Sequence, residues 1–238
     1  MKIHMKTTAE LATSSLDEFH KFLSSLPDEP DTAEQSSNQT PPQDTVSIRT
    51  ALGWGEKYTT PIPLIGEKWF AALEEAIEAV EKRGIVAFLG GRGPGKTQMA
   101  AEVARKGKWP NDAKVWNGHH SVAGKTALYR RAMDVFLELR DAAQNNSGTS
   151  EKKVLDKLEA VGLLVIDEFQ ERGGTEWENR IICNLLDKRY SAERPTILIA
   201  NYTREEMAAA LSPSVKDRIR ENGKAIIFDW ESFRAKKP

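Results

Sequence analysis

Residues 85 to 97, IVAFLGGRGPGKT, are the most informative about the fold of this chain of 238 residues. The first part of this stretch, Ile85 to Gly90, is an apolar run bounded by glycine, which is typical of a buried β-strand. Its second part fits the pattern G-x-x-x-x-G-K-[ST], in which glycines let backbone N–H groups converge on phosphate oxygens. A helix is expected from about Lys96 to Lys106, with its positive end facing the same anion. A chance glycine-rich turn is the alternative, but the flanking strand and helix favour a nucleotide-binding loop.

Two side chains of this loop are expected to act on the phosphates directly. Lys96 would bridge the β- and γ-phosphates of ATP, and the Thr97 hydroxyl would hold Mg²⁺. The residues expected to bind the nucleotide are Gly90, Gly91, Arg92, Gly93, Pro94, Gly95, Lys96, Thr97 and Gln98. ATP and Mg²⁺ are therefore the expected cofactors.

Helix and strand signals alternate from about residue 64 onward. Strands are expected at residues 85–90, 114–116, 163–168, 196–201 and 225–230. Apolar residues at spacings of three and four predict helices between them. One of these helices runs through Leu128, Ala132, Val135, Phe136 and Leu139. Five parallel strands joined by helical crossovers imply a three-layer α/β/α sandwich.

Polar residues end two of the apolar strands. Asp167 and Glu168 directly follow the apolar run Leu163 to Ile166, at the edge where open α/β sheets bind their ligands. Asp167 is expected to join the Mg²⁺ shell and Glu168 to polarise an attacking water, which indicates hydrolysis and not binding alone. Asn201 ends the neighbouring strand, where its amide would orient the water or contact the γ-phosphate. A plain strand terminator is the alternative for Asn201.

The composition excludes several classes of protein. The chain is 39% apolar and 29% charged with a formal charge of −1, and no apolar run approaches the roughly 20 residues of a membrane span. The sequence MKIHMKTTAE at its start lacks the apolar stretch of a signal peptide. The single cysteine, Cys183, allows neither an intrachain disulfide nor a cysteine-based zinc site. A cytoplasmic protein without a membrane partner is expected.

The first 47 residues differ in charge from the rest of the chain. They hold three bases and eight acids, whereas the remainder holds 31 bases and 27 acids. Apolar residues at helical spacing in this part are Leu11, Leu16, Phe19, Phe22, Leu23 and Leu26. They predict a helical segment over residues 1–26 that either docks on a partner or packs back on the main domain. Residues 27–48 are expected to be a flexible acidic, proline-rich linker, followed by an ATPase domain over residues 49–238.

Taken together, the motifs resemble those of the AAA+ ATPases of the DnaC type, the bacterial replicative-helicase loaders, and of the neighbouring IstB-type transposition ATPases. The resemblance covers about residues 64 to 235 and is carried by GGRGPGKT, LLVIDE, NLLDKRYSAERPTILIAN, SVKDRIR and FDWESFR. It implies an ASCE-type P-loop fold with strand order 5-1-4-3-2, no C-terminal lid, and ATP bound between neighbouring protomers that self-associate. Asn201 would be sensor 1, and Arg218 would be the arginine finger acting on the next subunit's nucleotide. Arg220 and Arg234 are weaker candidates for phosphate or interface contacts.

The same resemblance implies an ATP-dependent replicative helicase loader that helps place a ring helicase on single-stranded DNA during DNA replication. Residues 1–26 would hold the helicase. The alternative is an IstB-like transposition helper that forms ATP-dependent filaments on duplex DNA. A small-molecule P-loop kinase is disfavoured because no run of lid arginines is present, whereas DRIR and the acidic pair are.

A possible contact for single-stranded DNA is less distinct. The stretch HHSVAGKTALYRRA mixes cations with an aromatic residue, as grooves that track a single strand do. Its candidate residues are His119, His120, Lys125, Tyr129, Arg130 and Arg131. A solvated helix face explains the same composition equally well.

Overall fold

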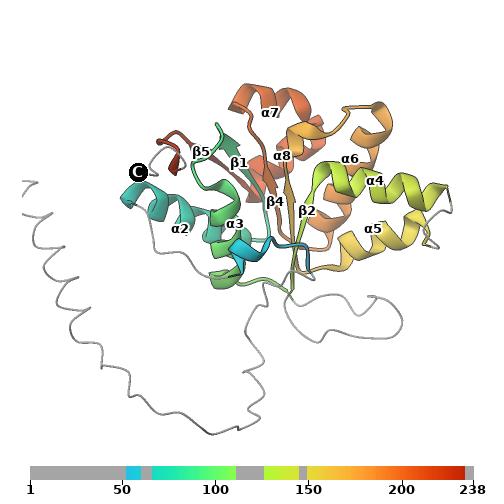
Figure 1. Cartoon of the computed structure of the whole chain (residues 1–238), viewed down its shortest axis with the longest axis horizontal. Helices are drawn as coiled ribbons and strands as arrows, with labels where there is room; N and C mark the ends of the chain where they lie inside the picture. The colour runs from blue at the N-terminus through green and yellow to red at the C-terminus, as the bar shows by residue number, and fades with distance from the viewer. Residues whose placement is uncertain (1–51, 60–65, 111–125, 145–148, 234–238) are drawn as a thin grey trace, which may run out of the picture. The chain divides into compact units, whose positions relative to one another are not determined.

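The structure is a computed structural model that describes residues 52–59, 66–110, 126–144 and 149–233 (Figure 1). Several sequence-based expectations lie outside these residues: the helical segment 1–26, the linker 27–48, the strand 114–116, and the side chains of His119, His120, Lys125 and Arg234. Within the described ranges, no helix is both long and apolar enough to cross a membrane.

The described strands form one parallel sheet. Their bounds are β1 (Ile85–Gly90), β2 (Ala127–Arg131), β3 (Leu163–Asp167), β4 (Thr196–Ile199) and β5 (Lys224–Phe228). They lie side by side in the order β2-β3-β4-β1-β5, and every pairing is parallel. This order confirms the arrangement 5-1-4-3-2 that the motif resemblance implied.

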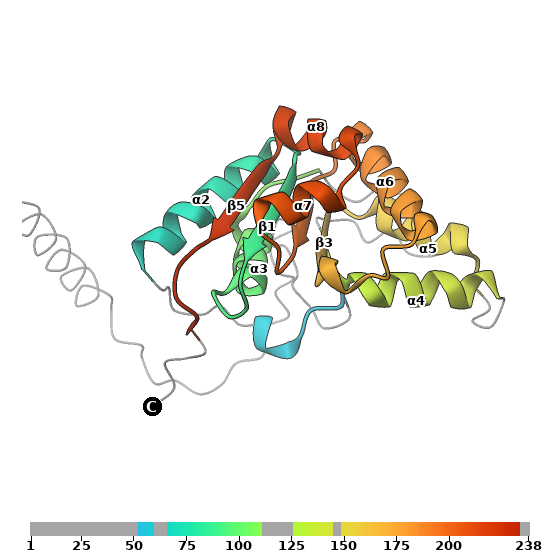
Figure 2. The same cartoon turned by 90° about the horizontal axis from the view of Figure 1, so that it is seen from above.

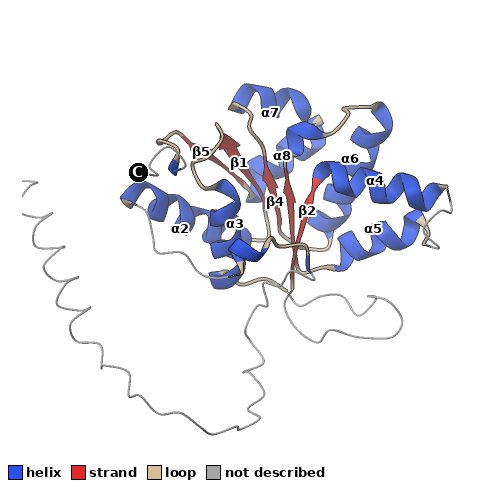
Figure 3. Ribbon diagram, in the orientation of Figure 1, coloured by secondary structure: helices blue, strands red, loops and turns tan. Residues whose placement is uncertain are grey.

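Helices cover both faces of the sheet, as parallel strands require because each connection must cross over. The helices are α2 (Glu67–Glu81), α3 (Lys96–Lys106), α4 (Ala132–Ala143), α5 (Glu151–Ala160), α6 (Glu176–Ser191), α7 (Arg204–Ala210) and α8 (Pro213–Asn222), with short 3-10 turns η2 (Glu56–Tyr58) and η3 (Phe169–Glu171). One apolar core lies between the sheet and α2 and α3, and the other lies between the sheet and α4 to α8. The two helical layers flank the strands in Figures 2 and 3. The three-layer α/β/α prediction is therefore confirmed.

The strands are apolar on both faces because both faces are covered. Successive residues of β1 alternate between the two cores: Val86 and Phe88 face α2 and α3, while Ala87 and Leu89 face the opposite layer. Burying both faces explains why β1 and β3 read as continuous apolar runs in the sequence.

The strand next to β3 differs from the sequence prediction. It is β2, in which Leu128 pairs with Leu164, whereas the sequence analysis placed Leu128 on a helix. The helix α4 begins only at Ala132. The spacing of four between Leu128 and Ala132 fits a helix as well as the later spacings do, so periodicity alone could not locate this boundary. Pairing with β3 keeps Leu128 extended.

Side-chain caps begin the two helices that follow β4. Thr203 and Glu206 form a reciprocal capping box at the start of α7. The Ser212 side chain accepts a hydrogen bond from the backbone N–H of Val215, and Pro213 occupies the first turn of α8. These caps fix where the chain leaves the sheet edge after β4.

A buried arginine of the NLLDKRY stretch ties α6 to the starts of β3 and β4. Arg189 is fully buried. Its guanidinium donates to the side chain of Thr196 and to the backbone carbonyl oxygens of Leu158, Glu159, Val161, Gly162 and Pro195. Arg189 thus provides hydrogen-bond donors for backbone carbonyl groups at the end of α5 and at the starts of β3 and β4.

Candidate nucleotide-binding site

The phosphate loop connects β1 to α3, where the sequence placed it. Gly90 and Gly93 adopt φ angles of 128° and 98°, a region that residues with a Cβ rarely enter. A Cβ on Gly90 would lie 2.5 Å from the carbonyl oxygen of Phe228, and one on Gly93 would lie 1.9 Å from the Ser232 hydroxyl oxygen. Glycine is therefore required at both positions by conformation and by space.

Lys96 lies inside this loop and reaches the end of β4. Lys96 is buried, with a relative exposure of only 6% for the whole residue. Its Nζ donates to the carbonyl oxygens of Gly90 at 2.8 Å and Gly91 at 2.5 Å, and to Asn201 Oδ1 at 2.9 Å. The structure thus brings together two predicted site residues, Lys96 and Asn201, that are 105 positions apart in the sequence.

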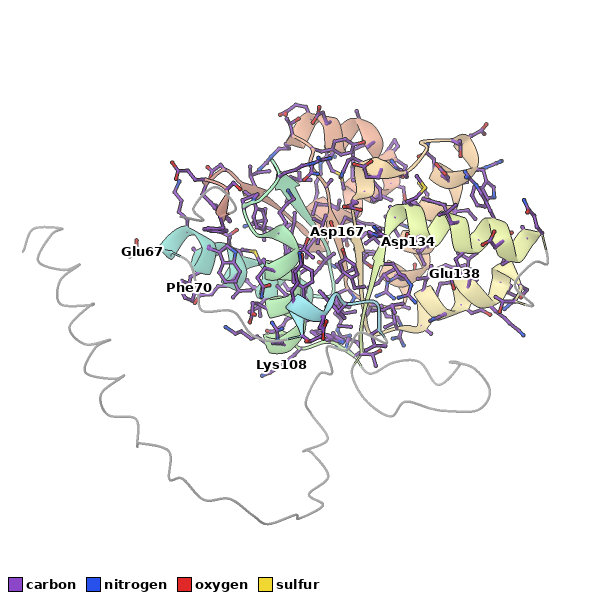
Figure 4. All side chains as sticks on the ribbon, in the orientation of Figure 1. Glu67, Phe70, Lys108, Asp134, Glu138 and Asp167 are labelled. Carbon is purple, nitrogen blue, oxygen red and sulfur yellow. The ribbon has the colours of Figure 1, made fainter. Side chains whose placement is uncertain are left out.

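Thr97 and Asp167, the two predicted magnesium ligands, are in direct contact. The Thr97 hydroxyl donates to Asp167 Oδ2 at 2.7 Å, and the backbone N–H of Glu168 donates to Asp167 Oδ1 at 2.7 Å. Asp167 is buried, at 6% exposure, near the middle of the domain (Figure 4). The loop therefore lies against the carboxyl end of β3.

These two side chains fit the cation that the fold class implies. A hydroxyl and a carboxylate are the hard oxygen ligands that Mg²⁺ prefers, and Mg²⁺ is usually held by one or two carboxylates together with phosphate oxygens and water. In the part of the chain that is described, no group of three or more His, Cys, Asp or Glu side chains could hold a metal alone. Thr97 and Asp167 are thus suited to an ion that arrives with a nucleotide.

The backbone turns sharply directly after Asp167. Glu168 adopts φ 52° and ψ 41°, a left-handed conformation that is uncommon for a residue with a side chain. Glu168 is exposed, whereas Asp167 is buried. The two adjacent acids therefore have different surroundings, as their predicted separate roles require.

A contact that the sequence analysis missed fixes the end of β4. The side-chain oxygen of Gln170, on η3, accepts a hydrogen bond of 3.0 Å from the backbone N–H of Asn201. Gln170 lies only two residues beyond Glu168, so this bond links the two polar strand ends. Its residue type and position gave no separate signal, because glutamine at a loop position is unremarkable in a sequence.

Three other predicted loop residues contact protein groups around the site. The Arg92 guanidinium is 3.7 Å from Glu171 Oε1 in an exposed ion pair. Gln98 on α3 donates to Glu102 Oε1 at 3.1 Å. Pro94 offers its carbonyl oxygen to Trp230 Nε1 at 3.0 Å.

An aromatic pocket of about 410 Å³ lies beside the loop. Its lining is Gly66, Glu67, Lys68, Trp69, Trp230, Glu231 and Phe233. The backbone N–H of Phe233 donates to the carbonyl oxygen of Gly93 at 3.1 Å, and a Cβ on Gly95 would lie 3.4 Å from the Trp69 indole nitrogen. Trp230 was not predicted from the sequence to be part of this site. The tryptophans and phenylalanine of FDWESFR and α2 meet only in the folded chain.

Arg218, the predicted arginine finger, lies apart from this site. It belongs to α8, where its guanidinium is 2.7 Å from Asp187 Oδ1 and 5.3 Å from the ring centre of Tyr190. Ser214 Oγ accepts a further hydrogen bond from it. A residue that acts on a neighbouring protomer is expected to lie away from its own loop, so the role of Arg218 stays a prediction. Arg220 forms an exposed ion pair with Asp217 at 2.9 Å.

The candidate DNA contacts that are described lie on β2 and not on a helix face. Tyr129, Arg130 and Arg131 are consecutive residues of this strand, so the helix-face interpretation is wrong for them. Arg131 pairs with Asp134 at 2.9 Å. The Tyr129 hydroxyl donates to Asp167 Oδ2 at 2.9 Å. Burial raises the pKa of the Tyr129 phenol above its ordinary value, and the nearby Asp167 carboxylate raises it further.

The strand order, the glycine loop and the acidic strand end define a domain with the AAA+ fold. Solved structures share this fold. They include the DnaC helicase loader, with a TM-score of 0.54 at 18% identity over 73% of this chain and 99% of that one. They also include the replication initiator DnaA bound to AMPPCP and single-stranded DNA, with a TM-score of 0.53 at 16% identity over 74% of this chain and 51% of that one.

In sequence, the chain is a relative of the replicative helicase loader DnaC, as the motif resemblance predicted. It is 34% identical to the loader of Escherichia coli strain K12 over 170 residues, which cover 69% of this chain and 64% of the loader. It is 28% identical to the loader of Buchnera aphidicola from Acyrthosiphon pisum over 149 residues, covering 62% and 55%. The alignments thus span less than two thirds of these relatives' own length. No family model matches the chain.

Proposed function

We propose that this chain binds ATP with Mg²⁺ and hydrolyses it. The observation that carries the proposal is the pair of contacts that joins the phosphate loop to two strand ends: Lys96 to Asn201 at 2.9 Å and Thr97 to Asp167 at 2.7 Å. A loop that only turned the chain would not need a buried lysine and a buried carboxylate at the same sheet edge. The AAA+ fold supports the same conclusion.

Each part of the nucleotide has a matching part of the site. The loop amides, Lys96 and Gln98 would hold the phosphates, and the bound Mg²⁺ would offset charge on the β- and γ-phosphates. The aromatic pocket beside Gly95 suits a purine ring, because bases stack on tryptophan and phenylalanine. Trp69 and Trp230, which are far apart in the sequence but line the same pocket, would enclose this base.

The hydrolytic step would use three side chains. Glu168 is exposed beside the buried Asp167, where it can accept a proton from an attacking water. Asn201, held by Gln170, would orient that water or the γ-phosphate. Arg218 of a neighbouring protomer would stabilise the charge that develops on the transferred phosphoryl group. This requires self-association with the nucleotide at the subunit interface.

The experiment is ATP binding and turnover measured on the wild type and two variants. Lys96→Ala should abolish ATP binding, because Lys96 is the buried positive charge of the loop, whereas Arg92 is exposed and paired with Glu171. Glu168→Gln should retain ATP but stop turnover, since the amide cannot accept the proton. Equal loss of binding in both variants contradicts the separate roles, and unchanged turnover in Glu168→Gln contradicts the general base.

We further propose that the ATPase serves as a cytoplasmic replicative helicase loader, acting on a ring helicase and single-stranded DNA. The support is the relationship to proteins named replicative helicase loader DnaC. The helicase would be held by residues 1–26, joined by the linker 27–48 to the ATPase domain 49–238. An IstB-like transposition helper is the second candidate, because its motifs are similar.

Co-purification separates these two candidates. If the chain is a loader, a replicative helicase should form a stable complex with the full chain, and deletion of residues 1–30 should abolish that complex while ATP binding persists. Filaments on duplex DNA that need ATP and no helicase would instead support the transposition role. A helicase complex that survives the deletion would refute the assignment of residues 1–26 as the binding segment.

A further inference from the structure

One phenol reaches the acidic end of β3 from the neighbouring strand. The Tyr129 hydroxyl and the Thr97 hydroxyl both donate to the same oxygen, Asp167 Oδ2, at 2.9 Å and 2.7 Å. The other oxygen, Oδ1, accepts from the backbone N–H of Glu168. Asp167 is thus held by donors from α3, from β2 and from its own strand end. The phenol is the one contact of the three that the phosphate loop and the acidic motif do not supply.

Tyr129 is itself fixed by a segment that lies far away in the sequence. The Trp54 ring centre is 5.1 Å from that of Tyr129, and Trp54 Nε1 donates to the carbonyl oxygen of Ala127 at 2.7 Å. Gly53 adopts φ 87°, and a Cβ there would lie 2.1 Å from the Tyr129 carbonyl oxygen. Trp54 is 1% exposed. The indole therefore packs at a tilt against the tyrosine ring and anchors the strand that carries it, which leaves the phenol little rotational freedom.

We propose that Tyr129 is a positioning residue for the magnesium site, holding the Asp167 carboxylate in the orientation that Mg²⁺ and Thr97 require. This rests on the proposed ATPase function and adds a residue to it. The phenol does not contact the nucleotide; it acts through Asp167. Its hydrogen bond keeps Oδ2 beside the Thr97 hydroxyl before the ion arrives, so less reorganisation accompanies metal binding.

The phenol is suited to this role because it stays a donor. A neutral hydroxyl can donate to Asp167 without competing for the cation as a second anion would. Loss of a partner in this outer shell typically costs about 10- to 100-fold in metal affinity.

The test is Tyr129→Phe, which keeps the ring against Trp54 and removes only the hydroxyl. Equilibrium binding of a fluorescent ATP analogue is measured with Mg²⁺ and again with EDTA, and the ratio of the two affinities reports the contribution of the ion. Tyr58→Phe is the matched control. It removes a phenolic hydroxyl from the same side of the domain, and no hydrogen bond from that hydroxyl is found among the described residues.

For Tyr129→Phe, the affinity gained from Mg²⁺ should fall by about tenfold, with unchanged affinity in EDTA. Tyr58→Phe should match the wild type in both conditions. A wild-type gain that persists in Tyr129→Phe overturns the positioning role and leaves the proposed function intact. An equal loss with and without Mg²⁺ also overturns it, because the role would then be structural. A wild type that gains nothing from Mg²⁺ overturns both proposals.

Discussion

Replacing Arg189 with alanine should destabilise the domain by several kcal/mol without changing any residue of the nucleotide site. Arg189 is fully buried. Three of its acceptors are backbone carbonyl oxygens at 2.7 to 2.8 Å, those of Leu158, Val161 and Pro195. A buried polar group left without a partner costs about 1 to 3 kcal/mol, and water entering the vacated space recovers part of that. The expected loss in the free energy of unfolding is about 3 to 5 kcal/mol.

Urea unfolding of the two proteins measures this loss, with the slope of the transition checked for constancy. For a domain of this size the expected fall in Tm is about 6 to 20 °C, since each kcal/mol corresponds to about 2 to 4 °C. Lys188→Ala is the matched control, because the neighbouring Lys188 forms a surface ion pair with Glu159 at 2.7 Å, worth about 0 to 1 kcal/mol. Arg189→Ala proving no more destabilising than Lys188→Ala would refute the reasoning.

Three further outcomes are expected from the site. Arg218→Ala should lower turnover by about 10³- to 10⁵-fold at nearly intact ATP affinity. Mixing this variant with Glu168→Gln should restore some activity only if sites are shared between subunits. Steady-state assays of the mixture measure this. Trp230→Leu should weaken ATP binding by about 5- to 100-fold, as loss of one stacking partner does, but leave inorganic triphosphate binding unchanged in competition titrations. Because the pKa of Tyr129 is raised in the folded state, the stability it contributes is complete below the ordinary value of 10.0 and is lost as pH rises above it. Chemical unfolding from pH 9 to 11 should therefore show a steeper decline for the wild type than for Tyr129→Phe, and parallel declines would contradict the shift.

The strand, loop and helix around the phosphate site could be predicted because each depends on neighbours in the chain. The loop from Gly90 to Lys96 contains backbone conformations that only glycine adopts readily. The glycines in the local sequence therefore predict the loop. The same holds for the capping box of Thr203 and Glu206. Where a residue type is demanded by its own backbone, reading the sequence suffices.

The position of β2 could not be predicted in this way. Leu128 fits a helical spacing and a strand equally well, and the pairing of β2 with β3, which sets Leu128 opposite Leu164, decided between them. The choice depended on a partner strand and not on intrinsic propensity, which is the usual reason that short apolar runs are misassigned.

The candidate site shows the same division. Asp167, Glu168 and Asn201 were identified because polar residues directly after apolar strands must gather at one edge of a parallel sheet. Gln170, which fixes Asn201, and Tyr129, which reaches Asp167, were not identified as parts of this site. Both act through side chains that cross between elements, and no spacing along the chain encodes such a crossing.

The class of fold, the phosphate loop and the acidic strand end follow from the order of residues alone, because glycine conformations, strand burial and strand-end polarity are properties of contiguous residues. The residues that surround those motifs are known only from the folded chain: Trp54 packed against Tyr129, the phenol on Asp167, and the pocket between Trp69 and Trp230. Each of these contacts joins segments that are far apart in the chain. Their distances are set by how the helices pack on the sheet, which is a collective property of the whole core.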